Sequence, residues 1–131
     1  MNTSISISLF LAGLFDIALI VFHMFFWKLF QWDTQLKKVS ALNKGVMQVM
    51  NMALMVIFLL FAYLLFFEGN NLIETSFGRT ILIGIAFFWF MRTLFQPIFF
   101  GCKNLTAAAF IGIFATGSFL HILPIALFLN N

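Results

Sequence analysis

The chain has 131 residues, of which 63% are hydrophobic, 8% are charged and 21 are Phe. A soluble domain is about a quarter charged and cannot bury that much Phe, so this composition predicts an integral membrane protein without a separate soluble domain. The net charge of +3 comes from basic residues at segment ends, so it indicates membrane orientation and not nucleic-acid binding. A single cysteine, Cys102, excludes an internal disulfide.

Four apolar segments are each long enough to cross a bilayer as a helix, which takes about 20 residues. They cover residues 5–30, 46–67, 80–100 and 105–129. The connections between them are residues 31–45, 68–79 and 101–104. Because short connections favour antiparallel neighbours, we expect one all-α membrane domain over residues 1–131, built as an up-down bundle of four transmembrane helices.

The charges of the connections predict how the bundle is oriented. The first connection carries three lysines and the third carries Lys103, whereas Glu68 and Glu74 lie in the second. Basic loops stay on the cytoplasmic side, so the first and third loops are expected in the cytoplasm, the second outside, and both termini outside. We expect a multi-pass protein of a bacterial inner membrane, because the chain is short and poor in loops.

The first segment carries ionisable residues inside an otherwise apolar stretch. Asp16 lies near its middle, and His23 lies two turns further on, on the same helix face. An ionisable group at that depth is costly unless it meets a partner or water, so it marks a functional site. A proton relay suits this pair of residue types, because His titrates near neutrality. The other alternative is that each His makes an interhelical hydrogen bond that only supports packing.

Polar residues of all four segments fall into two layers when they are counted from the expected cytoplasmic ends. The inner layer is rich in hydrogen-bond donors, and the middle layer holds the only intramembrane acid. The inner layer includes His23, Gln48, Asn51, Arg92 and Gln96, and the middle layer is Asp16 and His121. Helix faces of this kind point into a bundle, because lipid offers no hydrogen bonds. These seven residues are the predicted ion or substrate pathway.

Arg92 is the most informative of these residues, because a guanidinium keeps its charge and is expensive near a bilayer centre. Asp16 is the only acid at comparable depth, about 9 Å away along the membrane normal. Arg92 is expected to point toward the N-terminal end of its helix, which shortens that gap. The alternatives are an Asp16–Arg92 pair, or an Arg92 that reaches the inner interface and anchors its helix.

The two histidines and the methionines raise the question of a cofactor. His23 and His121 differ in depth by roughly 13 Å, too far for the two axial ligands of one haem iron, so haem would need a single His or a site shared between subunits. Thioethers can hold Cu(I), but the methionines of the second segment do not share one face. These are Met47, Met50, Met52 and Met55. We expect no cofactor, with haem and copper as the open alternatives.

In size and helix number the chain resembles the small four-helix exporters and the dual-topology fluoride channels. Asp16 resembles the single membrane acid in the first helix of the small multidrug exporters. A first-segment His followed by Trp27 resembles small His-containing families linked to porphyrin oxidation and copper resistance. Neither the surroundings of Asp16 nor the third segment matches the exporter motifs, so the sequence places the chain in no family.

Three classes of function follow from these observations. The first is translocation of a proton, ion or small anion through the polar interior; it requires a homo-oligomer, because four helices enclose little room. The second is a membrane enzyme or cofactor-binding protein acting on a hydrophobic substrate, although no phosphate-binding loop, zinc motif or nucleophile elbow appears. The third is an accessory subunit of a membrane complex. We favour the first, because the polar layers draw on all four segments.

Overall fold

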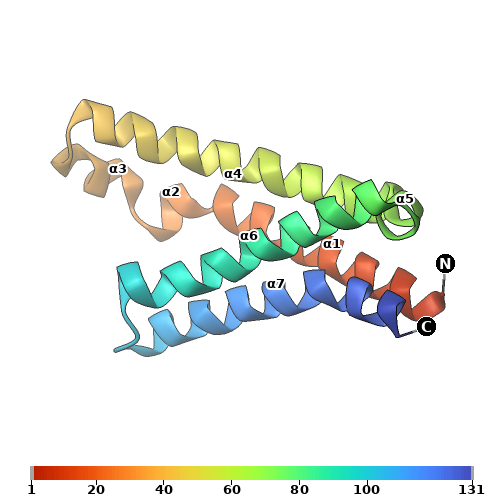
Figure 1. Ribbon diagram of the computed structural model, residues 1–131. Helices are drawn as coiled ribbons and strands as arrows, with labels where there is room; N and C mark the ends of the chain where they lie inside the picture. The colour runs from red at the N-terminus through yellow and green to blue at the C-terminus, as the bar shows by residue number, and fades with distance from the viewer. Residues whose placement is uncertain (1, 131) are drawn as a thin grey trace.

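The structure, a computed structural model, describes residues 2–130. Four helices in this range are long and apolar enough to cross a membrane. They are α1 (Thr3–Met24), α4 (Ala41–Phe67), α6 (Ser76–Phe100) and α7 (Leu105–Leu129). Successive long helices run antiparallel, and the two ends of the chain lie at the same end of the bundle (Figure 1). The prediction of an all-helical chain with four such helices is confirmed for the described residues.

Each long helix begins where a short polar side chain accepts a hydrogen bond from a backbone N–H of the first turn. The capping residues are Asn2, Ser40, Thr75 and Asn104. Such caps satisfy N–H groups that have no partner inside the helix. They place the starts of α4 and α6 several residues before the expected 46 and 80, whereas α7 has the predicted bounds.

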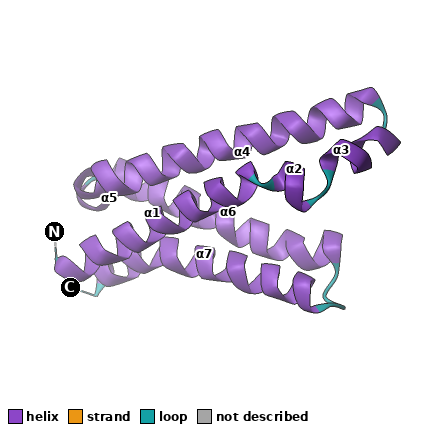
Figure 2. Cartoon of the chain, turned by 180° about the vertical axis from the view of Figure 1, so that it is seen from behind, coloured by secondary structure: helices purple, strands orange, loops and turns teal. Residues whose placement is uncertain are grey.

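We expected one helix over residues 5–30, but α1 ends at Met24. Three short helical pieces follow it, the first inside the apolar segment and the other two in the connection to α4. These are α2 (Phe26–Leu29), α3 (Trp32–Gln35) and the 3-10 turn η1 (Leu36–Lys38). Figure 2 shows the breaks between them as loops. At the first break, Asn51 of α4 donates a hydrogen bond to the His23 carbonyl at 3.2 Å. That carbonyl lies at the end of α1 and also faces the backbone N–H of the capping residue Phe25, so a contact between helices adds to the local bonds at the break.

The connection between α4 and α6 also contains a helix, α5 (Gly69–Glu74). The start of α6 passes so close to α5 that a Cβ atom on Gly78 would collide with the backbone of Asn71 and Leu72. Glycine is therefore required at Gly78 for close backbone approach. The tight corner sets the angle at which α6 leaves α5.

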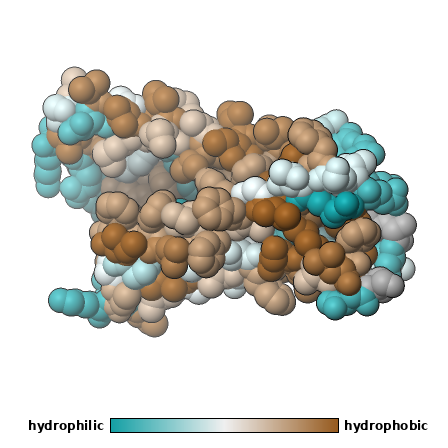
Figure 3. Space-filling view, in the orientation of Figure 1, coloured by the Kyte–Doolittle hydropathy of each residue, from teal (hydrophilic) through white to brown (hydrophobic). Residues whose placement is uncertain are grey.

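The bundle consists of two helix pairs that diverge at one end. Helix α6 packs along α7, and α1 packs on α4 and α7, whereas the backbones of α4 and α6 scarcely meet. Aromatic side chains fill the gap between α4 and α6, and the rings of Phe58 and Trp89 stack at 5.2 Å. Hydrophobic residues cover the middle of the visible face, and hydrophilic ones gather at its two ends (Figure 3). The bundle thus has a largely apolar interior and an apolar outer surface around its middle.

Candidate functional site

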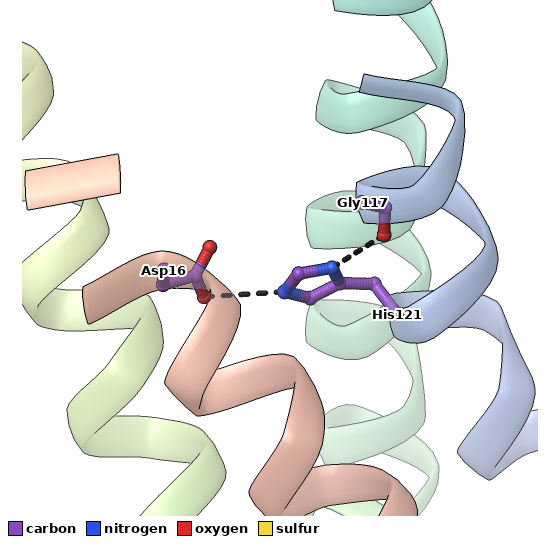
Figure 4. A network of polar contacts seen from close by, with 3 residues as sticks. All are labelled: Asp16, Gly117 and His121. Carbon is purple, nitrogen blue, oxygen red and sulfur yellow. Dashed lines mark hydrogen bonds and ion pairs between the residues drawn. The ribbon is translucent and has the colours of Figure 1, made fainter. Parts of the chain in front are cut away.

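A buried polar contact joins the first and last long helices near the middle of the bundle. The Nε2 atom of His121 lies 3.1 Å from Oδ2 of Asp16, and both side chains are fully shielded from solvent (Figure 4). The other ring nitrogen of His121 donates to the carbonyl of Gly117 at 2.7 Å. Both predicted middle-layer residues therefore meet, and Asp16 pairs with His121.

An aromatic wall lies against this pair. The indole ring of Trp89 stacks over His121 at 5.9 Å, and Phe15 meets both rings edge-on. Oδ1 of Asp16 and Nε1 of Trp89 are both buried here, and neither reaches the geometry of a full hydrogen bond within the described chain, although the indole N–H lies near enough to the carboxylate to interact with it. The pair is thus enclosed by rings, and Trp89 adds a weak polar contact to it.

A large cavity lies toward the end where the two helix pairs diverge. Its volume is about 790 Å³, which falls in the range of small-molecule sites. Its polar lining residues are His23, Gln35, Lys38, Arg92, Gln96, Asn104 and Thr106, and most of the others are aromatic or aliphatic. We call it the Arg92 cavity. Among the described residues it is lined by two permanent cations, Lys38 and Arg92, and by no carboxylate.

Arg92 is half-buried in the wall of this cavity. Its Nη1 atom donates to Oε1 of Gln96 at 2.9 Å, and its guanidinium lies 4.1 Å from the centre of the Phe114 ring. The guanidinium also faces Phe100, eight residues further along α6. Of the two alternatives for Arg92, the pair with Asp16 does not form within the described residues, and the guanidinium lies toward the C-terminal end of α6. In the described chain its charge is met by a neutral amide and by rings.

His23 and Asn51 are in contact at the C-terminal end of α1. The Nδ1 atom of His23 donates to the Leu19 carbonyl at 2.8 Å, and its ring stacks on Phe26 at 4.4 Å. His23 also lines the Arg92 cavity, and its Nε2 atom makes no hydrogen bond within the described residues. His23 is therefore separated from the Asp16–His121 pair, and it belongs to the cavity.

The structure thus divides the seven predicted residues. Asp16 and His121 form one site, and His23, Arg92 and Gln96 line the other. Asn51 holds the end of α1. Gln48 is partly exposed on α4 and makes no hydrogen bond to any described side chain, so it joins neither site.

The geometry also bears on the two cofactor alternatives. Both ring nitrogens of His121 already bond to protein atoms, so this residue presents no free nitrogen to a haem iron. Met50 and Met52 lie exposed on the outside of α4. Within residues 2–130, no three His, Cys, Asp or Glu side chains gather in a metal-binding group.

Several residues of both sites were not predicted from the sequence. Trp89 touches both sites, Phe114 stacks on Trp89 and lines the cavity, and Lys38 reaches the cavity from η1. In a chain with 21 Phe and three Trp, no local pattern marks which rings face inward. The spacing of Trp89 and Arg92, one turn apart on α6, is a signal that could have placed Trp89 on the polar face.

No protein-family model, curated protein or solved structure was found to match this chain.

Proposed function

We propose that the protein binds a hydrophobic anion in the Arg92 cavity and moves it across the membrane. The observation that carries this proposal is the mismatch of charge in the cavity: two cations, a largely apolar lining and no acid within the described residues. A half-buried guanidinium without an anionic partner is costly in an apolar medium. A carboxylate, sulfonate or phosphate group on an apolar body complements both the charge and the rings.

The proposal includes the membrane setting. Four apolar helices with hydrophilic ends support a multi-pass membrane protein. We propose the bacterial inner membrane as its location, because the chain is short and poor in loops. With both termini outside, the Arg92 cavity opens toward the cytoplasm, because it lies at the end that carries Lys38 and the α6–α7 turn. The ligand enters at the end where the two helix pairs diverge, because aromatic side chains close the gap between α4 and α6 nearer the middle of the bundle. We further propose a homo-oligomer, since one bundle encloses little aqueous space.

Translocation, rather than binding alone, is supported by a second cavity at the opposite end. Its volume is about 460 Å³, and Ser6, Phe10, Phe66 and Asn70 are among its lining residues. The buried Asp16–His121 pair lies between the two cavities along α1. A cavity at each end with a closed layer between them is the arrangement that alternating access requires.

The proposal predicts that a permanently charged amphiphile quenches Trp89. In a Trp27→Phe/Trp32→Phe background in nanodiscs, Trp89 is the sole tryptophan and can be excited selectively over Tyr63. It is fully buried and lines the cavity. Terminally brominated dodecanesulfonate should quench it saturably. Arg92→Gln should weaken this binding by about 10- to 100-fold, the value of a charge-assisted contact of about 1.5–3 kcal/mol.

Two controls make this experiment decisive. Brominated phosphatidylcholine stays in the surrounding lipid and should leave Trp89 fluorescent, because that indole has no lipid-exposed surface. Terminally brominated dodecanol lacks the charge, so it should bind Arg92→Gln and the parent protein equally. Equal sulfonate affinity in the two proteins would remove the anion site from the proposal.

An enzyme acting on the same kind of ligand is the second candidate, and it rests on His23. Its Nδ1 atom is held by the Leu19 carbonyl, which leaves Nε2 as a base at the cavity wall. Turnover would change the mass of an amphiphile recovered after incubation with the protein. Transport would move it between vesicle compartments without altering its mass.

A further inference from the structure

The hydrogen bonds of His121 fix where its protons lie. The Nδ1 atom faces a carbonyl oxygen, which only accepts, so Nδ1 carries a hydrogen. The Nε2 atom faces Oδ2 of Asp16 at 3.1 Å. Without a proton in this contact, the lone pair of Nε2 would face the lone pairs of a carboxylate. The observed geometry therefore needs a proton between Nε2 and Oδ2, either on the imidazolium or on the carboxylic acid.

With that proton the Asp16–His121 pair is neutral, and without it the pair carries one negative charge. Arg92 carries a fixed positive charge in the same apolar interior, whereas Lys38, the other cation of the cavity, is exposed. In the protonated state the interior has a net positive charge, which an anion at Arg92 neutralises. In the deprotonated state Asp16 and Arg92 already balance, so a bound anion would leave a net negative charge. Uncompensated charge in such a medium is costly, so proton and anion favour each other.

The two sites are in continuous contact through side chains. The Arg92 guanidinium lies on Phe114, Phe114 stacks on Trp89 at 6.2 Å, and Trp89 stacks on His121. No aqueous layer separates the charges along this route, so their electrostatic interaction is weakly screened.

The other ionisable groups on the helices packed around the Asp16–His121 pair do not neutralise its charge. On α2, α4 and α5 these are Lys28, Lys44, Tyr63 and Glu74, all exposed. At the start of α6, Arg79 donates to the Ile73 carbonyl and lies over Phe128. Lys38 on η1 lines the cavity but is exposed. His23 on α1 and Arg92 on α6 are left, and of the described cavity residues His23 is the one rival whose residue type titrates near neutrality.

From these observations we propose that the Asp16–His121 pair is a proton-binding site, and that its proton is taken up together with the anion at Arg92. The proton enters the Nε2–Oδ2 contact when the anion binds and leaves when the anion leaves. The protein then carries one proton with each monovalent anion and no net charge. This inference rests on the proposed anion site and adds the ion to which its occupancy is coupled.

The test is the pH dependence of dodecanesulfonate binding, read from Trp89 quenching over about pH 5 to 8. The probe keeps its charge over this range, so any linked proton belongs to the protein. Affinity should fall with rising pH, with a limit of about tenfold per pH unit for one linked proton. Independently, a pH indicator in a weakly buffered nanodisc suspension should report net proton uptake. The sulfonate is added there to protein that keeps Asp16, His121 and Arg92.

Two variants assign the proton. Asp16→Asn cannot ionise and should bind the sulfonate with the same affinity at every pH, with no proton uptake. His23→Gln should keep both the pH dependence and the uptake per bound sulfonate.

Binding without pH dependence or proton uptake, or a dependence lost in His23→Gln, would overturn the coupling while leaving the anion site intact. Absence of binding at every pH would overturn both proposals. The indicator measurement decides the matter if Asp16→Asn does not fold.

Discussion

At the scale of single residues, the Asp16–His121 contact joins two long helices inside an apolar bundle. Both side chains are fully shielded from solvent, and each ring nitrogen of His121 makes a hydrogen bond with a protein oxygen. Removing either partner leaves the other buried with an unmet polar group, which costs more than the pair contributes when intact. The two substitutions should therefore be strongly non-additive.

We predict this non-additivity for unfolding in mixed micelles. Asp16→Ala and His121→Ala should each lower the free energy of unfolding by several kcal/mol, because each strands a buried group. The double variant should lose about 1–3 kcal/mol less than the sum of the two. Asp33→Asn, on the exposed side of α3, is the matched control, with a change within about 0.5 kcal/mol. Additive losses would show that the two side chains do not interact.

The sequence predicted the polar residues themselves but not all their partners. Asp16 and His121 were placed at one depth because helix rise gives depth directly. Depth alone does not say which helices adjoin, so Arg92 was offered as a partner for Asp16. The choice depends on α7 packing on α1 and on the direction of the Arg92 side chain, both of which arise from tertiary contacts.

At the scale of helices, Gly78 controls the corner between α5 and α6. A Cβ atom there would meet the Asn71 carbonyl oxygen and the Leu72 Cα, which are backbone atoms that cannot rotate away. Its counterpart Gly84 lies on the same helix with open space around the same position.

We predict opposite effects for alanine at these two glycines. Gly78→Ala should lower the free energy of unfolding by about 1–3 kcal/mol, because the corner must open. Gly84→Ala should leave stability unchanged or raise it by up to about 1 kcal/mol, since alanine is the better helix former. Thermal unfolding of the two variants in the same detergent measures both. Equal melting temperatures would mean that α5 and α6 do not pack as described.

Hydropathy predicted the C-terminal ends of α4, α6 and α7, but not the starts of α4 and α6 or the end of α1. The bounds of the fourth segment agree with α7 because Asn104 caps it immediately before its apolar run. The break after Met24 has no local signal: no Gly or Pro is near, and Gln31 alone of the described non-glycine residues takes a positive φ, 49°. Contacts from α4, above all that of Asn51, support that break.

At the scale of the whole molecule, an asymmetric distribution of charge accompanies an asymmetric interior. The wide end holds the larger cavity, Lys38 and Arg92, and the narrow end holds the chain termini and the acidic α5 connection. The sequence predicted the charge pattern and the antiparallel order. It did not predict the divergence of the two helix pairs, because divergence depends on which large side chains stand between α4 and α6.

The orientation of the molecule decides from which side the Arg92 cavity fills, and Cys102 can report it. This cysteine is exposed in the α6–α7 turn at the wide end and is the only thiol of the chain. With both termini outside, a membrane-impermeant maleimide should leave Cys102 unmodified in spheroplasts and label it after permeabilisation. In a Cys102→Ser background, Asn70→Cys places a thiol at an exposed position of α5, at the opposite end, and this variant should be labelled before permeabilisation. The reverse labelling pattern would mean that the Arg92 cavity faces the outside, so that the protein would take up the anion from that side. Partial labelling of both thiols would mean that the chain inserts in both orientations, so that an oligomer could contain antiparallel copies.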